Sequence, residues 1–407
     1  MPLPLSGLRV VDFSRVLAGP HCGKHLIDLG AEVIKVEPPG GDLSRRAFPM
    51  QGAVAGYYAQ QNAGKRDISV DLNVPEMREV VMRLCETADV IVENFRPGAL
   101  GSFGLDYESV AAVKPDIVYV SVSGYGQRGN WAGRMAYAPT VQAEVGFTRT
   151  TLTHFQAEGG ARRTDALSHA DVYSGLHATI AVLAALQHRA ATGQGQYVDV
   201  AMAAVMTSIN ERVHVDLGEV ELGAERPVLG ATDAPFFTSP EGDPFVVPMS
   251  LVGSLTFPFY CRAMRRPDLA DDPRFLAAEL REANFAALHA IVQTWIGTFD
   301  TMGALDAQFD EAKIATGIVR GIDEFAASEW ADEWGVTRTV SDRAAGTITI
   351  PGMPWHFSRH EEPLGEQVPA LQGEHNVEVL TELGYDQQQI ESFYTAAGLV
   401  EPDRARS

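Results

Sequence analysis

Short apolar runs alternate with amphipathic stretches along the first 122 residues of the chain. The apolar runs have the length and composition of buried strands, and they cover residues 8–13, 33–37, 68–72, 90–92 and 117–122. The stretches between them have helical spacing or helix-start signals, at 21–29, 75–88 and 107–113. This alternation predicts an α/β fold with an open, parallel, Rossmann-like sheet and helices on both faces.

Polar and flexible segments follow the predicted strands. Open parallel sheets bind ligands beyond the carboxyl ends of their strands, so these segments hold candidate pocket residues. They are rich in Gly, Pro and polar side chains and cover residues 15–20, 37–42, 72–73, 93–98 and 123–127. Gly and Pro also form ordinary turns in every α/β fold, so composition alone leaves both interpretations open.

The pattern changes in the second half of the chain. A helix is predicted over 171–189 from an apolar face made by Val172, Leu176, Ile180, Leu183 and Leu186. A strand is predicted at 197–200, and two runs at 236–237 and 245–247 predict a hairpin. The region of roughly 225–330 is therefore predicted to form a second, smaller α+β domain, and the tail from 373 to 398 to be helical.

Charge limits the classes of partner. The 407 residues include 32 Lys and Arg against 53 Asp and Glu, a formal net charge of −21. Such a surface repels polyanions, so we expect no nucleic-acid partner and no anionic membrane surface. An anionic ligand would have to bind in a local pocket that is basic or lined with backbone amides.

The cysteines and the apolar segments indicate the cellular compartment and whether a membrane is involved. Cys22, Cys85 and Cys261 lack the spacing of a zinc site or a disulfide framework, which favours a reducing cytoplasm. Residues 1–7 lack the features of a signal peptide, and the most apolar long run, 177–186, is too short to span a bilayer. No membrane role is predicted.

Several well-known catalytic motifs do not occur. Residues 16–23 lack GxGxxG and the Walker pattern, which argues against NAD binding and nucleotide hydrolysis. Ser123 lacks the Gly two positions before it that a nucleophile elbow needs, and the histidines form no HExxH.

Asp171 has two interpretations. Ser168 stands three residues before it, as in a capping box, so the carboxylate could simply satisfy backbone amides at a helix start. A carboxylate in the first turn of a helix is also kept ionised by the helix dipole and could act as a nucleophile. Spacing alone does not decide between them.

Motifs spread over most of the chain carry a family resemblance. They lie at residues 8–20, 29–38, 41–45, 62–72, 88–98, 121–126, 192–200 and 373–385. With these motifs the chain resembles the family III CoA-transferases of the formyl-CoA and carnitine type, a family that also contains the α-methylacyl-CoA racemases. The region from about 218 to 350 is weakly matched.

The resemblance implies an architecture and a binding site. It implies a discontinuous large CoA-binding domain, residues 1–210 and 331–407, a linker and small α+β domain at 211–330, and an interlocked homodimer. CoA or acyl-CoA would enter as a substrate, with no permanently bound cofactor and no metal, and a small carboxylic acid would be the second substrate. The implied CoA contacts are Arg15, Val16, Leu17, Ala18, Pro38, Leu72, Asn73, Asn94, Phe95 and Arg96. Positive charge for the phosphates would come from Arg15, Arg45, Lys65 and Arg96.

The resemblance also places the catalytic nucleophile of the family on Asp171. The implied reaction passes through an aspartyl anhydride and an aspartyl-CoA thioester, which keeps the acyl group activated throughout. Backbone amides near Leu17 and Ala18 would stabilise the oxyanions. The identity of the acids is not readable from the sequence.

Two alternatives stay open. In the racemases a histidine works with the aspartate, but the matching positions here are Tyr137 and Ala138, so His154 or His169 would have to replace it. A catalytically silent CoA-binding protein would keep the same loops. The chain also departs from many transferases of the family, because Ala138 replaces an acid and residues 229–235 are not a glycine-rich lid.

Overall fold

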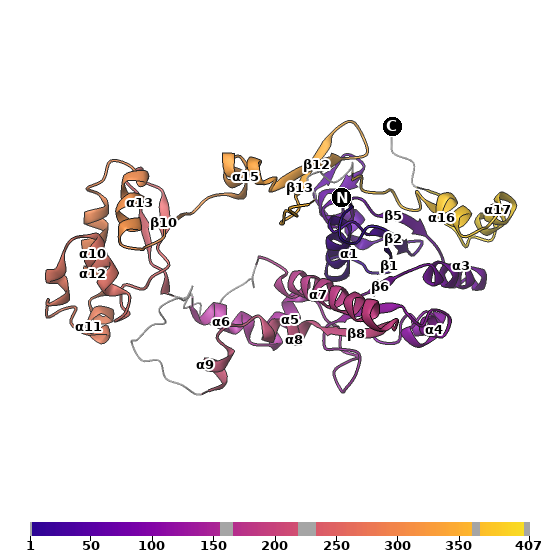
Figure 1. The fold of residues 1–407 in the computed structure, drawn as a ribbon, viewed down its shortest axis with the longest axis horizontal. Helices are drawn as coiled ribbons and strands as arrows, with labels where there is room; N and C mark the ends of the chain where they lie inside the picture. The colour runs from indigo at the N-terminus through magenta and orange to yellow at the C-terminus, as the bar shows by residue number, and fades with distance from the viewer. Residues whose placement is uncertain (1, 155–165, 219–232, 360–366, 403–407) are drawn as a thin grey trace. The chain divides into compact units, whose positions relative to one another are not determined.

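The computed structural model describes residues 2–154, 166–218, 233–359 and 367–402 (Figure 1). The chain divides into two compact units, residues 1–211 with 329–407, and residues 212–328. Within the described ranges, no helix is both long and apolar enough to cross a membrane.

The first unit is built on a six-stranded sheet in which every strand pair is parallel. The strands in spatial order are β5 (Arg66–Ser69), β2 (Glu32–Glu37), β1 (Arg9–Asp12), β6 (Val90–Glu93), β7 (Val118–Ser123) and β8 (Gln196–Ala201). β2 and then β5 are added on one side of β1. The chain then returns to the other side of β1, where β6, β7 and β8 follow in order. Strand order therefore reverses between β1 and β6, and such a reversal opens a crevice at the carboxyl ends of the two strands.

Successive residues of the strands point to opposite faces. Val10 packs into one apolar core and Val11 into another, as expected for an alternation of period two. The first core is covered by α1 (Ala18–Asp28), α5 (Ala138–Glu144), α7 (His169–Thr192) and α8 (Met202–Ser208). The second is covered by α3 (Pro75–Glu86), α4 (Tyr107–Val113), α16 (Asn376–Glu382) and α17 (Gln387–Thr395). The predicted α/β class with a parallel sheet is confirmed.

Helix α7, which lies along the sheet in Figure 1, buries a different face from the predicted one. Ile180 is 62% exposed and Leu183 is 38% exposed, whereas small residues such as Gly175 and Ala178 are buried. A Cβ at Gly175 would lie 2.6 Å from the carbonyl oxygen of Ala18 on α1. The predicted helix forms, but close packing against α1 selects small residues for most of its buried face; of the predicted apolar residues, Leu186 packs against the core.

The C-terminal part of the chain returns to the edge of the sheet. Single bridges join Ala63 to Pro369 and Val70 to Leu399. Around this edge lie η1 (Leu43–Arg46), β3 (Met50–Gln51), β4 (Val54–Ala55), α2 (Gly56–Asn62) and the hairpin of β12 (Thr337–Ser341) with β13 (Thr347–Pro351). Other elements of this unit are η2 (Gly101–Phe103), α6 (Phe147–His154) and α15 (Glu329–Trp334).

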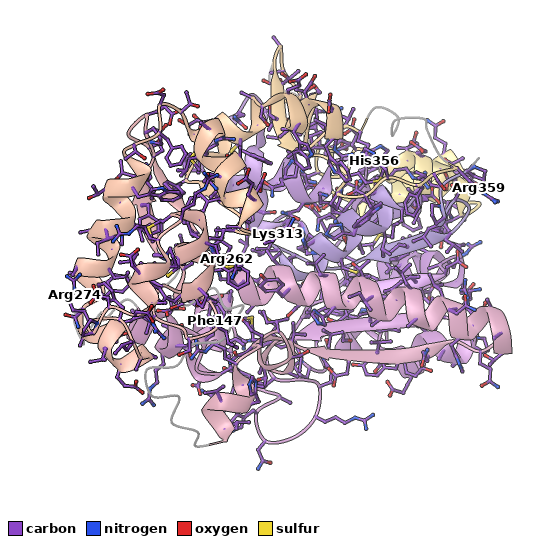
Figure 2. All side chains as sticks on the ribbon, turned by 60° about the vertical axis from the view of Figure 1, so that its left-hand side comes forward. Phe147, Arg262, Arg274, Lys313, His356 and Arg359 are labelled. Atoms are coloured by element: carbon purple, nitrogen blue, oxygen red, sulfur yellow. The ribbon has the colours of Figure 1, made fainter. Side chains whose placement is uncertain are left out.

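The second unit has its own core. The predicted hairpin forms as β9 (Phe236–Thr238) and β10 (Pro244–Val246), and β11 (Gly317–Ile318) adds a third antiparallel strand. Phe237, Phe245 and Phe309 are buried with residues of α10 (Phe257–Ala263), η4 (Pro267–Ala270), α12 (Phe285–Ile296) and α13 (Met302–Glu311). The unit also contains α9 (Val213–Leu217), α11 (Ala278–Ala283) and α14 (Ile322–Ala326). At its surface, Arg274 pairs with Asp272 and lies over the ring of Phe275 (Figure 2).

Candidate active site

Two cavities open at the carboxyl ends of the strands, around the β1–β6 reversal. The first, which we call the Asp171 cavity, has a volume of about 290 Å³; its walls include Arg15, Val16, Leu17, Ala18, Asn94, Phe95, Arg96, Arg134, Tyr137 and Asp171. The second, the Pro38 cavity, has a volume of about 270 Å³; its walls include Phe13, Arg15, Pro38, Pro39, Leu72, Asn73, Phe95, Leu100 and Phe103. Arg15 and Phe95 line both cavities, so Asp171 and the ten predicted CoA contacts line two cavities that share part of their walls.

The loop between β1 and α1 has an unusual backbone. Val16 has a φ of +68°, a left-handed conformation that is costly for a β-branched residue. Its N–H donates to the carboxylate of Asp42 at 3.1 and 3.2 Å. The Asn94 side chain accepts from the N–H of Arg15 and donates to its carbonyl oxygen, both at 2.8 Å. These bonds hold Val16 and Arg15 in place from both sides.

Buried ion pairs lie below this loop. Lys35 Nζ lies 3.0 Å from Asp42 and donates to the carbonyl oxygen of Ser14 at 2.6 Å. Burial alone would raise the pKa of Asp42, but the charge of Lys35 and the bonds from Ser44 hold it to about 2. The loop is therefore anchored by the buried ion pair of Lys35 and Asp42.

Two of the cations expected to bind phosphates belong to this buried layer. Lys65 is 2% exposed and donates to Asp12 at 2.8 Å. Arg45 donates to Glu37 at 2.7 Å and to Asp67 at 3.0 Å. Because both cations are neutralised by internal carboxylates, the structure contradicts their predicted role. Arg15 and Arg96 line the Asp171 cavity and stay available for that role.

Asp171 lies in the first turn of α7 and faces the Asp171 cavity. Ser168 is the N-cap residue, but its side chain makes no capping bond, so of the two interpretations the capping box is wrong. Burial raises the pKa of Asp171 to about 6. The carboxylate is therefore ionised at neutral pH but poorly solvated, which is what a nucleophile needs.

The start of α1 faces the same cavity. Its N-cap residue, Leu17, offers no side-chain cap, and Leu17 and Ala18 line the cavity. The first backbone amides of a helix point outward with a partial positive charge, so they can stabilise an anion.

Two residues near Asp171 were not identified from the sequence. The guanidinium of Arg134, which lines the cavity, lies 4.3 Å from the ring centre of Trp131 and 5.0 Å from that of Tyr125. Burial and then the charge of Asp171 raise the pKa of Tyr57 to about 12, which places this α2 residue within electrostatic reach of the carboxylate. Arg134 lies three residues before Tyr137, one of the two positions compared above with the racemases, so the neighbourhood of that position could have pointed to it.

No histidine is among the described residues that line the Asp171 cavity. The ring of His169 stacks on that of Tyr173, with 5.9 Å between the ring centres, and lies 5.3 Å from the ring centre of Phe147. Phe147, the first residue of α6, is labelled in Figure 2. The side chain of His154 and most of the lid segment 229–235 lie outside the described residues.

Comparisons with known proteins agree on one family. A family model described as CoA-transferase family III matches residues 5–376. The succinate–glutarate CoA-transferase of Agrobacterium fabrum is 32% identical over 394 residues, which cover 93% of this chain and 96% of that protein. The succinyl-CoA:mesaconate CoA-transferase of Haloarcula hispanica is 33% identical, with 93% and 96% covered. A crystal structure of a CAIB/BAIF family protein from Brucella suis matches with a TM-score of 0.75 at 30% identity, covering 94% of this chain and 100% of that one.

Proposed function

Since this chain belongs to CoA-transferase family III and is an enzyme of that family, we propose that it moves CoA between two dicarboxylic acids with Asp171 as the nucleophile. The observation that carries the proposal is a partly buried carboxylate, Asp171, in one cavity with Arg15, Arg96 and Arg134. Cations beside the carboxylate suit substrates that bring several negative charges of their own.

The two cavities suit the two ends of an acyl-CoA. The Pro38 cavity is mainly apolar, with Leu72, Leu100 and Phe103 in its wall, and suits the adenine ring. Arg15, which lies 4.6 Å from the ring centre of Phe95, stands between the cavities and suits the phosphates. The thioester would then reach the Asp171 cavity.

The chemistry proceeds in four balanced steps. An Asp171 oxygen attacks the thioester carbon; the new C–O bond forms, the C–S bond breaks, and CoA leaves as a thiolate. The thiolate attacks the Asp171 carbonyl carbon of the anhydride, releases the donor acid and leaves an aspartyl-CoA thioester. The acceptor carboxylate attacks this thioester and releases the thiolate again. The thiolate finally attacks the acceptor's acyl carbon, which forms the product and regenerates Asp171. The amides at Leu17 and Ala18 stabilise each oxyanion.

The dicarboxylate preference is proposed from the relatives and from Arg134. The Agrobacterium and Haloarcula relatives are named for succinate, glutarate and mesaconate, which carry a second carboxylate. Arg134 lines the cavity, contacts two aromatic rings and donates from Nη2 to the surface carboxylate of Glu144 at 2.7 Å. Unlike Arg45 and Lys65, it is exposed and pairs with an exposed carboxylate. A bidentate contact to a distal carboxylate fits this geometry.

Acceptor competition tests the preference. With succinyl-CoA as donor, we expect glutarate and mesaconate to be better acceptors than butyrate or acetate. Arg134→Met should raise the KM for the dicarboxylate by about 10-fold or more, since the second carboxylate loses its partner. Equal use of butyrate by the unmodified enzyme would contradict the proposed substrate class.

We also propose that the protein is a homodimer. Ile180 and Leu183 form an exposed apolar stripe on α7, and a second copy of the chain would remove it from water. Sedimentation equilibrium should give a dimer mass, and Ile180→Glu should weaken the dimer. Val377→Glu, at a residue 54% exposed on α16, is the matched control. A monomer of the unmodified protein would contradict this proposal.

A further inference from the structure

The wall of the Pro38 cavity is held by a residue from the far end of the chain. Gln372 is 9% exposed, and its side-chain amide nitrogen donates to the carbonyl oxygens of Pro38 and Pro39, each at 3.1 Å. The same nitrogen donates to Ser69 Oγ at 2.9 Å. Its two hydrogens are thus shared among three acceptors, and two of these belong to the turn that lines the cavity.

The turn depends on this support for a chemical reason. Pro38 and Pro39 have no backbone N–H, so the turn offers carbonyl oxygens without donors of its own at these positions. The Gly41 N–H and the Ser69 Oγ also donate to the carbonyl oxygen of Pro38, at 2.8 and 3.2 Å, whereas Gln372 is the described side chain that donates to Pro39. Gly41 has a φ of +71°, and a Cβ there would lie 3.0 Å from the Gln372 side-chain oxygen. A side chain at position 41 would therefore crowd the Gln372 amide.

Neighbouring bonds fix the position of Gln372. The N–H of Gly373 donates to Asp67 at 2.6 Å, and the Asn376 side-chain oxygen accepts from the N–H of Ser69 at 2.9 Å. The C-terminal segment is thereby tied to β5, the strand next to β2, which leads into the turn. A movement of this segment would move the cavity wall.

We propose that Gln372 is a positioning residue for CoA: it fixes the Pro38–Pro39 turn in the place where the turn forms the wall of the adenosine site. This inference rests on the proposed function, because it assumes that CoA occupies the Pro38 cavity. Gln372 lines neither cavity, so it acts through the turn and not by touching the reacting atoms.

Two substitutions test the proposal. Gln372→Glu places a carboxylate against two carbonyl oxygens and Gln372→Met removes the donors at similar volume. We expect the KM for acyl-CoA and the Kd for free CoA to rise about 10-fold with Glu and roughly 3-fold with Met. The kcat and the KM for the acceptor acid should stay within about 2-fold, because Asp171 and its surroundings do not change. Gln194→Glu, at an exposed residue between α7 and β8, is the control and should behave as the unmodified enzyme.

The outcomes separate this inference from the proposed function. If the unmodified enzyme neither binds CoA nor transfers it, the proposed function fails. If the unmodified enzyme is active and both folded variants keep its KM and Kd, the positioning role is wrong. A parallel loss of kcat and thermal stability in Gln372→Met, with an unchanged KM for acyl-CoA, would show a merely structural role and would also overturn the proposal.

Discussion

Replacing Asp171 with Asn should abolish transfer and at the same time stabilise the folded protein at neutral and higher pH. Asn keeps the shape of the side chain and removes the charge. Burial raises the pKa of Asp171 to about 6, so the folded protein binds this proton more tightly than the unfolded chain does. The contribution of Asp171 to stability is therefore present at low pH and is lost as the pH rises through about 6.

The size of the effect follows from the pKa. A pKa of about 6 in the folded protein, against about 4 in the unfolded chain, corresponds to at most about 3 kcal/mol. Asp171 lines an open cavity and keeps some contact with water, so we expect about half of that, roughly 1–2 kcal/mol at pH 8. For a chain of this length, the apparent Tm of Asp171→Asn should exceed that of the unmodified protein by about 1–3 °C.

Thermal unfolding from pH 5 to pH 8, at one protein concentration and without CoA, tests this. The Tm difference between Asp171→Asn and the unmodified protein should grow with pH and level off above pH 7. Asp310→Asn, at an exposed residue of α13, should show no such trend. A Tm advantage that is absent, or that shrinks as the pH rises, would refute the view that a buried charge at Asp171 destabilises the fold.

The remaining predictions concern the pH profile and the buried charges. The kcat/KM for acyl-CoA should fall about 10-fold per pH unit below about pH 6, because the nucleophile Asp171 becomes protonated. If stopped assays show that kcat/KM begins to fall only below about pH 4, the raised pKa of Asp171 is contradicted. Lys35→Met should lower the free energy of unfolding in urea by about 3–5 kcal/mol, because Asp42 would lose its buried partner. Arg46→Met, at an exposed neighbour in η1, should change it little, and equal effects of the two would argue against the buried ion pair.

Local patterns predicted much of the fold. The strand–helix alternation predicted the parallel sheet. The segments that follow the strands predicted Arg15, Asn94 and other residues that line the cavities. This works because a buried parallel strand needs a continuous apolar run, and the ends of such strands meet at one edge of the sheet.

Long-range packing could not be predicted in the same way. The large apolar residues of α7 have helical spacing, but the approach of α1 at Gly175 made the small-residue face the buried one. Lys65 looks in the sequence like a phosphate ligand, and only the fold reveals Asp12 beside it. Gln372 gives no local signal, because its partners at Pro38 and Pro39 lie more than 330 residues earlier in the chain.

Intact-protein mass spectrometry tests the central claim, that CoA is transferred through Asp171. The protein would be mixed with succinyl-CoA, quenched in acid and measured before and after treatment with hydroxylamine, with Asp171→Asn in parallel. We predict an adduct of the mass of CoA on the unmodified protein, removed by hydroxylamine and absent from the variant. An adduct of equal amount on Asp171→Asn, or full transfer activity in that variant, would contradict the account.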